Sequence, residues 1–111
     1  MPHNFTIPTN RRPVTPGEML DEEFIKPLDF TQQEFAEKLG IDRPSLNSII
    51  NGRRRITPEM AMRLSIVLGT TPEYWLNAQM ICDLYEAAHS PEIAKLKREL
   101  KRLSKRELAS V

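Results

Sequence analysis

The sequence has only one cysteine, two histidines and four glycines among its 111 residues. A single cysteine excludes a disulfide within the chain and gives no sign of an oxidising compartment. No hydrophobic run approaches the ~20 residues of a membrane helix, and residues 1–15 lack the hydrophobic segment of a signal peptide. These absences predict a cytoplasmic protein with no membrane partner.

Side chains suited to catalysis or metal binding are equally scarce. His3 and His89 have no cysteine or carboxylate at the spacing of a metal site. Cys82 lies in a hydrophobic stretch without a histidine at motif spacing, which favours a small buried side chain over a nucleophile. There is no glycine-rich phosphate loop, and the adjacent acids Glu22 and Glu23 would point in different directions on a helix. We therefore expect no enzyme, no metal site and no cofactor.

The charged residues are unevenly distributed, although the net charge is only +1. Residues 31–69 carry six basic and four acidic groups, and residues 91–111 carry seven and three. Residues 1–30 carry three and five, whereas residues 70–90 carry no basic and three acidic groups. This alternation would let one surface face DNA while another meets a basic partner, although a mosaic of solvated charges fits the composition equally well.

Helix start and stop signals recur along the chain and predict an all-α fold. Thr15 and Thr31 each precede a glutamate by three residues, the pattern of a capping box. Proline or glycine marks the expected helix ends, and no segment shows the alternation of a strand. We expect an extended arm over 1–14, a five-helix domain over 15–89 and a charged amphipathic helix over 90–111. The six helices are expected to begin after Thr15, Thr31, Asp42, Thr57, Thr71 and Ser90.

The sixth helix is expected to continue to the C-terminus. Its apolar residues are spaced by three, four and three positions, as in a coiled-coil seam: Ile93, Leu96, Leu100 and Leu103. The seam breaks at Glu107, and helices this short are marginal alone. A fraying solvated tail therefore remains an alternative to packing against a second subunit or the body of the protein.

The segment from Thr31 to Arg55 has the pattern of a helix-turn-helix. Ala36 lies where two helices must pass closely, and Gly40 lies in the turn, where a positive φ is cheap only for glycine. Spaced apolar residues are expected to fill the wedge between the helices: Phe35, Leu39, Ile41, Leu46 and Ile49. Four residues then remain on the outer side of the second helix as candidate contacts to base edges in the major groove: Arg43, Pro44, Asn47 and Ser48.

Other polar residues of this segment are candidates for contacts to DNA phosphates. Gln32 opens the first helix, where its side chain and the helix N-terminus could both hold a phosphate. Ser45 and Asn51 are short polar groups suited to the same role. Arg53, Arg54 and Arg55 follow at once in a loop that should run beside the DNA backbone. A helical hairpin with a solvated basic loop is the alternative.

The segment TQQEFAEKLGIDRPSLNSIINGRRRIT resembles the helix-turn-helix of the Xre/Cro superfamily of repressors, whose lambda-repressor-like domain has five helices. The flanks VTPGEMLDEEFIKPL and ITPEMAMRLSIVLGTTPEYWLNAQMICDL resemble those of HigA-type (VapI-like) antitoxins. The resemblance covers about residues 13–85 and leaves the arm and the tail uncovered.

This resemblance implies the antitoxin of a type II toxin-antitoxin pair. Such a protein binds and neutralises a HigB-type toxin, a small basic RelE-like ribonuclease that cleaves mRNA. Its homodimer represses the shared operon by binding double-stranded operator DNA in the bacterial cytoplasm, and is nucleoid-associated when bound there. A stand-alone Xre-family repressor without a toxin would need the same DNA surface and stays open. A neighbouring reading frame for a small basic protein would favour the antitoxin.

The interpretation as an antitoxin predicts two further surfaces, one for the toxin and one for the dimer. Acidic residues around the first helix could attract a basic toxin: Glu18, Asp21, Glu22 and Glu23. One face of the fifth helix could form the two-fold dimer contact through Tyr74, Trp75, Asn77, Ala78 and Ile81. The alternative for this second group is closure of the core over the first and fourth helices.

Overall fold

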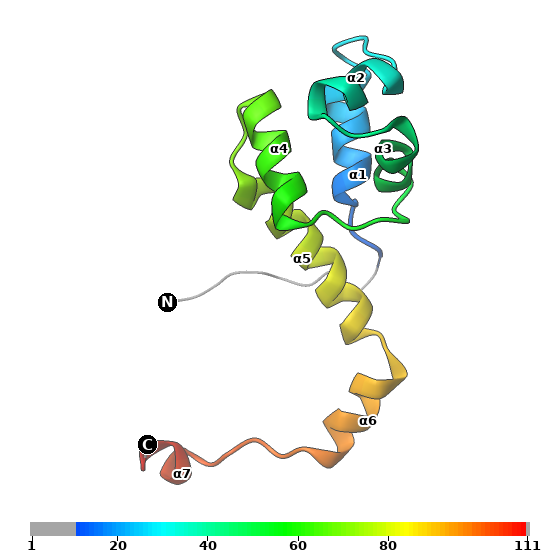
Figure 1. The fold of residues 1–111 in the computed structure, drawn as a ribbon. Coiled ribbons are helices and arrows are strands. Elements are labelled where there is room, and N and C mark those ends of the chain that lie inside the picture. The colour runs from blue at the N-terminus through cyan, green and yellow to red at the C-terminus, as the bar shows by residue number, and fades with distance from the viewer. Residues whose placement is uncertain (1–10, 111) are drawn as a thin grey trace.

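The computed structural model describes residues 11–110, which form helices and no strand. Helix α1 (Pro16–Leu20) continues into a π-helical turn, η1 (Asp21–Ile25). It is followed by α2 (Gln32–Leu39), α3 (Arg43–Ile50), α4 (Pro58–Leu68) and α5 (Pro72–Ala88). Two further helices, α6 (Pro91–Glu99) and α7 (Lys105–Ala109), complete the described chain (Figure 1). The expected all-α class is confirmed, whereas most of the predicted arm lies outside the described residues.

Side-chain caps explain where each helix begins. Thr15 accepts a hydrogen bond of 3.1 Å from the backbone N–H of Glu18, whose carboxylate accepts one of 3.0 Å from the N–H of Thr15. Thr31 and Glu34 form the same reciprocal box at 3.0 and 2.9 Å. Each of the other four predicted caps also accepts a backbone N–H three residues on: Asp42, Thr57, Thr71 and Ser90. All six predicted helix starts are therefore confirmed.

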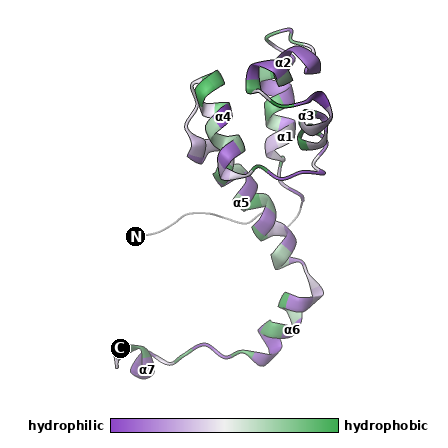
Figure 2. Cartoon of the chain, in the orientation of Figure 1, coloured by the Kyte–Doolittle hydropathy of each residue, from purple (hydrophilic) through white to green (hydrophobic). Residues whose placement is uncertain are grey.

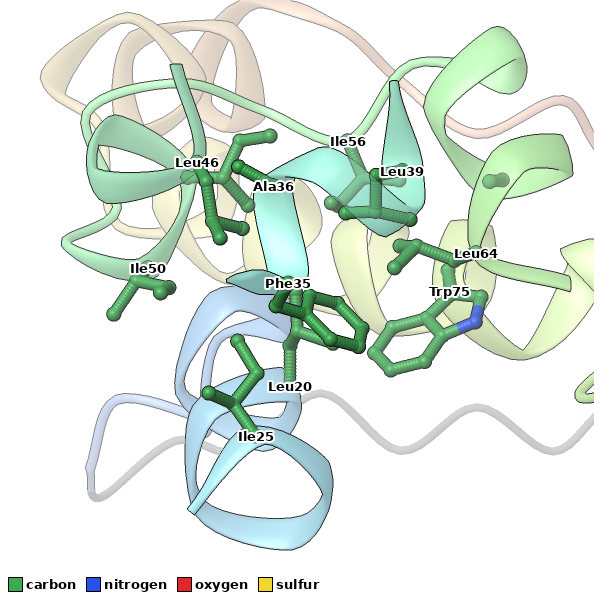
Figure 3. Packing of buried hydrophobic residues seen from close by; sticks show 12 residues of the cluster. Leu20, Ile25, Phe35, Ala36, Leu39, Leu46, Ile50, Ile56, Leu64 and Trp75 are labelled. Atoms are coloured by element: carbon green, nitrogen blue, oxygen red, sulfur yellow. The ribbon is translucent and has the colours of Figure 1, made fainter. Parts of the chain in front are cut away.

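The hydrophobic core lies where α1, α2, α3, α4 and the first turn of α5 meet (Figure 3). Trp75 enters it from α5, is completely buried, and donates its indole N–H to the Thr70 hydroxyl at 2.7 Å. Phe24 packs on the Trp75 ring at a centroid distance of 5.6 Å. Because these two rings come from opposite ends of the domain sequence, they join the first and fifth helical segments in one core.

Gly17 allows α1 to lie directly against the C-terminal end of α3. A Cβ atom at this position would stand 1.9 Å from the Ile49 carbonyl oxygen and 2.9 Å from the Ile50 Cα. Both neighbours are backbone atoms, so no side chain could move aside to make room. The close approach therefore requires glycine and fixes the position of α1 relative to the end of α3.

The C-terminal tail differs from the predicted single helix. Helix α6 stops at Glu99, Leu100 is extended (φ −90°, ψ 141°), and α7 starts afresh in a capping box between Ser104 and Glu107. Leu100 and Leu103 therefore lie outside α6, and the predicted seam through them is wrong. The physical reason is that neither tail helix buries a residue, and short helices without a packing partner are marginal. The tail projects from the end of α5 (Figure 1).

Candidate DNA-binding surface

Helices α2 and α3 form a tight helical pair joined by a left-handed turn. Gly40 ends α2 with φ 71°, and the Ile41 N–H donates to the Ala36 carbonyl at 3.0 Å. Ala36 is 0% exposed, as its predicted position between the helices requires. The predicted wedge residues Phe35, Leu39, Leu46 and Ile49 are buried, and Ile41 packs against them partly buried.

The outer side of α3 presents polar groups to solvent. Arg43 and Pro44 in its first turn are exposed, and Ser48 is half-buried one turn later. Asp42 caps the helix by accepting the Ser45 N–H at 2.7 Å, and this hydrogen bonding to Ser45 lowers the pKa of Asp42 below its ordinary value. Hydrophilic residues dominate α2 and the loop after α3 (Figure 2). The structure thus brings the predicted base-contacting residues onto one accessible helix face.

Asn47 is the centre of a hydrogen-bond network on α3. Its amide nitrogen donates to the Gln32 side-chain oxygen at 3.1 Å. Its amide oxygen accepts from the Asn51 amide and from the Arg53 guanidinium, both at 3.1 Å. The network joins the first residue of α2, the middle of α3 and the loop after it. Four residues predicted separately as base or phosphate contacts therefore form one unit.

The loop after α3 turns back along that helix. Gly52 adopts φ 75°, and the backbone N–H groups of Arg53 and Arg54 both donate to the Ser48 carbonyl, at 2.8 and 3.2 Å. The Arg54 guanidinium donates to the Ser45 hydroxyl at 2.8 Å. Both arginine side chains thus lie beside the N-terminal half of α3, next to the candidate base contacts. This is where a clamp on the DNA backbone would have to be.

Arg55 has a different environment from its two neighbours. Its guanidinium donates two hydrogen bonds, of 2.8 and 2.6 Å, to the Asp83 carboxylate on α5. The hydrogen bond from Arg55 is the main cause of a lowered pKa at Asp83, and the same bond raises the pKa of Arg55. Arg55 thus forms an exposed ion pair within the chain, and a DNA phosphate would have to compete with the Asp83 carboxylate for its donors.

Gln79 on α5 completes the connection between the basic loop and this helix. Its side-chain oxygen accepts the backbone N–H of Ile56 at 2.9 Å, and its amide nitrogen donates to Asp83 at 3.1 Å. Ile56 itself is buried. The start of the segment leading to α4 is thereby held against α5 by one side chain and one ion pair. Neither Gln79 nor Asp83 could be assigned this role from the sequence, because Ile56 and Arg55 lie more than twenty positions away along the chain.

The residues of α5 that were predicted to form the dimer contact lie partly in the core and partly on the surface. Trp75 is 0% exposed within its own chain, so it has no surface for a partner, and its assignment to the dimer contact is wrong. Tyr74 stacks edge-on against Trp75 at 5.0 Å but remains 38% exposed. Asn77 is exposed, and Ala78 and Ile81 are half-buried. Core closure therefore explains Trp75, and the other four residues remain available.

The acidic residues of the first helical segment are mostly engaged within the chain. Glu18 belongs to the capping box with Thr15, whose backbone hydrogen bond is the main cause of its lowered pKa. Lys26 lies 2.6 Å from the Glu22 carboxylate and 3.5 Å from that of Asp21. Among the described residues, Glu23 forms no salt bridge. The four acids thus share a region but do not form one free cluster.

Within residues 11–110 no group of three or more potential ligands could hold a metal ion. Cys82 is buried, its thiol pKa is raised by that burial, and its sulfur faces the Val14 carbonyl at 3.6 Å. The nitrogen Nδ1 of His89 lies 2.8 Å from the Tyr85 carbonyl, one turn back along α5. No helix of the described chain is long and apolar enough to cross a membrane.

This arrangement of two packed helices, an exposed second helix and an adjoining basic loop defines a helix-turn-helix protein. A helix-turn-helix family model matches residues 22–75. The antitoxin HigA-1 of Vibrio cholerae is 44% identical over 78 residues, covering 70% of this chain and 73% of that protein. The uncharacterized HTH-type transcriptional regulator YbaQ of Escherichia coli is 39% identical over 101 residues, covering 87% and 89%.

A solved structure extends the comparison to a DNA complex. The antitoxin GraA in complex with its operator has a TM-score of 0.75 and 38% sequence identity, covering 89% of this chain and 99% of that one. The chain belongs to the HigA-type antitoxin family within the Xre-type helix-turn-helix proteins. It is a DNA-binding regulator by family and not an enzyme.

Proposed function

We propose that this protein is the antitoxin of a type II pair, binds its own operator as a homodimer, and neutralises a small basic HigB-type toxin. The observation that carries the DNA-binding part is the shared face of α3 and the following loop: Arg43 and Pro44 are exposed at the start of α3, and Arg53 and Arg54 bond to Asn47 and Ser45 on the same helix. The operator complex of the GraA antitoxin supports the same use of this fold. The protein would act in the bacterial cytoplasm, at the nucleoid when bound to DNA.

In this proposal the contacts divide into readers and clamps. Arg43, Pro44 and Ser48 read base edges in the major groove, because they occupy the accessible side of α3. Arg53, Arg54 and the N-terminus of α2 hold phosphates and supply affinity without sequence choice. Asn47 positions these groups through its bonds to Gln32, Asn51 and Arg53, and Ser45 positions the Arg54 guanidinium.

The test measures fluorescence anisotropy on a labelled duplex from upstream of the gene and on a scrambled duplex of equal length. Arg43→Ala should weaken the operator complex by about 5- to 150-fold, the equivalent of one lost bidentate base contact, and the scrambled complex much less. Arg54→Ala should weaken both by similar factors, because phosphates are the same in both duplexes. Equal losses on both duplexes for both variants would exclude α3 as the reader.

The homodimer is proposed to form on the exposed side of α5 and the end of α4. Ile66 is 77% exposed, Val67 37% and Tyr74 38%, so apolar side chains are exposed both at the end of α4 and in the first turn of α5. Figure 2 shows the hydrophobic C-terminal end of α4. Asn77, Ala78 and Ile81 would extend this contact along α5. Burial of such surface in a two-fold contact would explain its exposure in the single chain.

The toxin contact is proposed to lie on the acidic side of α1 and η1. Glu23 carries the proposal, because Glu18, Asp21 and Glu22 already have partners within the chain. Co-expression of the protein with the small basic protein encoded beside its gene should yield a copurifying complex. Glu23→Lys should weaken that complex, whereas Glu92→Lys, the same charge change on exposed α6, should leave it unchanged. Copurification that withstands Glu23→Lys would move the contact elsewhere.

A stand-alone repressor is the second candidate, favoured by the similarity to YbaQ, which is described only as a transcriptional regulator. It shares every DNA contact proposed above and lacks the toxin. The copurification experiment separates the two candidates. Operator binding without any complex, and without rescue of cells that express the neighbouring protein, would leave the repressor as the function.

A further inference from the structure

The segment before α1 carries two adjacent arginines, Arg11 and Arg12, which the helix-turn-helix does not include. Both are exposed, and among the described residues neither forms a salt bridge. They lie some forty positions before the Arg53–Arg55 loop along the chain. Their place in the structure is nevertheless beside that loop.

Two contacts fix the path of the chain just after this pair. Gly17 lies against the Ile49 and Ile50 backbone, so α1 starts at the point where α3 ends. The Val14 carbonyl faces the Cys82 sulfur of α5 at 3.6 Å. These two contacts give residues 14–17 a defined course past the end of α3.

The Arg12 guanidinium consequently reaches the turn that follows α3. Its Nη2 atom lies 4.0 Å from the position that a Cβ of Gly52 would occupy. A surface pocket of about 160 Å³ is lined by Arg12 together with Arg53, Arg54 and Arg55. A neighbouring hollow joins Arg12 to Asn51 and Gly52. Four guanidinium groups from two distant segments therefore border one side of the basic loop.

Four arginines border these two hollows against three carboxylates, Asp83, Glu86 and Glu18, so the region keeps a net positive charge. Asp83 lines the same pocket but is held by the two hydrogen bonds from Arg55. Glu86 lines that pocket as well, and Glu18, which caps α1 with Thr15, lines the neighbouring hollow. Neighbouring guanidinium groups repel each other, and an anion placed between them removes that repulsion. A phosphodiester is an anion that arginine binds with good geometry.

We propose that Arg12 is a phosphate contact of the DNA complex, which extends the footprint from the helix-turn-helix to the segment before α1. The proposal rests on the DNA binding proposed above and adds a contact to the DNA backbone next to Asn51 and Gly52. Arg11, one residue further out, would lie along the same phosphate backbone. The contact is to the backbone, so it adds affinity on any sequence and no choice among operators.

The test is the salt dependence of binding to the operator duplex and to the scrambled duplex, measured with the full chain between 50 and 200 mM KCl. Each phosphate contact contributes about 0.9 to the slope of log K against log salt concentration. Arg12→Gln should lower the magnitude of the slope by about 0.9 and weaken both duplexes equally at low salt. Arg12→Lys, which keeps the charge, should retain the wild-type slope.

Arg98→Gln on exposed α6 is the matched control, because it removes the same charge far from the loop and should not change the slope. A wild-type slope in Arg12→Gln, alongside a lowered slope in Arg54→Gln, would overturn the proposal while leaving the proposed function intact. Absence of DNA binding by the wild-type chain would overturn both. A fall in melting temperature of Arg12→Gln without a change in slope would assign Arg12 to intramolecular packing instead.

Discussion

Replacement of Gly17 by alanine tests how closely α1 and α3 must approach. The new Cβ would stand 1.9 Å from the Ile49 carbonyl oxygen, whereas ordinary contacts begin at 3.4 Å, so the helices would have to separate by about 1.5 Å. Helix propensity alone predicts the opposite sign, because alanine in a helix is favoured over glycine by up to ~1 kcal/mol. The direction of the change therefore decides between local propensity and packing.

Overpacking costs typically about 1–3 kcal/mol, and the upper end applies here because the obstructing atoms belong to backbone. A loss of about 3 kcal/mol lowers the melting temperature of a domain of this size by about 12–24 °C. Circular dichroism melts of the wild type and Gly17→Ala give this difference directly. Helices that part by this distance would also displace the Asn51–Arg54 loop, so DNA affinity should fall in the fraction that remains folded.

Gly69→Ala is the control for this prediction. Gly69 has φ 77°, but no atom lies within 4 Å of its potential Cβ, so only backbone strain of about 1 kcal/mol is expected. The melting temperature should accordingly fall by about 4–8 °C. A Gly17→Ala protein as stable as the wild type, or more stable, would falsify the claim that glycine is required for the contact between α1 and α3.

Three other outcomes follow from the structure. The lowered pKa of Asp83 means that its ion pair with Arg55 stabilises the fold above pH 3.8, the ordinary carboxyl pKa, and that this stabilisation is lost as the pH falls through the lowered pKa. The difference in melting temperature between wild type and Asp83→Asn should therefore shrink below pH 3.8, and a constant difference would contradict the pairing. Truncation after Ser90 should leave the melting temperature within about 2 °C of the wild type, because α6 and α7 bury no residue, and a larger loss would reveal packing of the tail. Tyr74→Glu should shift the sedimentation coefficient toward that of a single chain, and an unchanged value would remove α5 from the dimer contact.

The helix starts could be predicted from the sequence because capping is a local interaction. Thr15 and Thr31 bond to backbone three residues away, so the pattern and its consequence share one short segment. The same logic was available in the tail, where Ser104 and Glu107 form a third capping box that marks the start of α7. The apolar spacing of the tail suggested one continuous helix instead. Apolar periodicity stabilises a helix when another surface buries its apolar face, and neither α6 nor α7 buries a residue.

The positions of the candidate site's side chains on α3 could be predicted from the sequence, but their contacts with other helices could not. Arg43, Pro44 and Ser48 could be placed on the outer face of α3, because burial of its apolar stripe leaves no other position for them. The pairing of Arg55 with Asp83 joins residues 28 positions apart and depends on how α5 crosses the loop. The need for Gly17 likewise arises from contact between two helices. Such features follow from the packed arrangement and have no local sequence pattern.

The bonds between the basic loop and α5 have a consequence for how two subunits would meet one duplex. Asp83 and Gln79 hold the segment after α3 against α5, which links the position of α3 to that of α5. In a dimer built on α5, the two-fold axis would then determine the separation of the two recognition helices, and with it the number of base pairs between operator half-sites. Half-site spacing would then be set by α5, which carries none of the proposed base contacts, and a change at Gln79 would alter which spacings are tolerated without altering which bases are read.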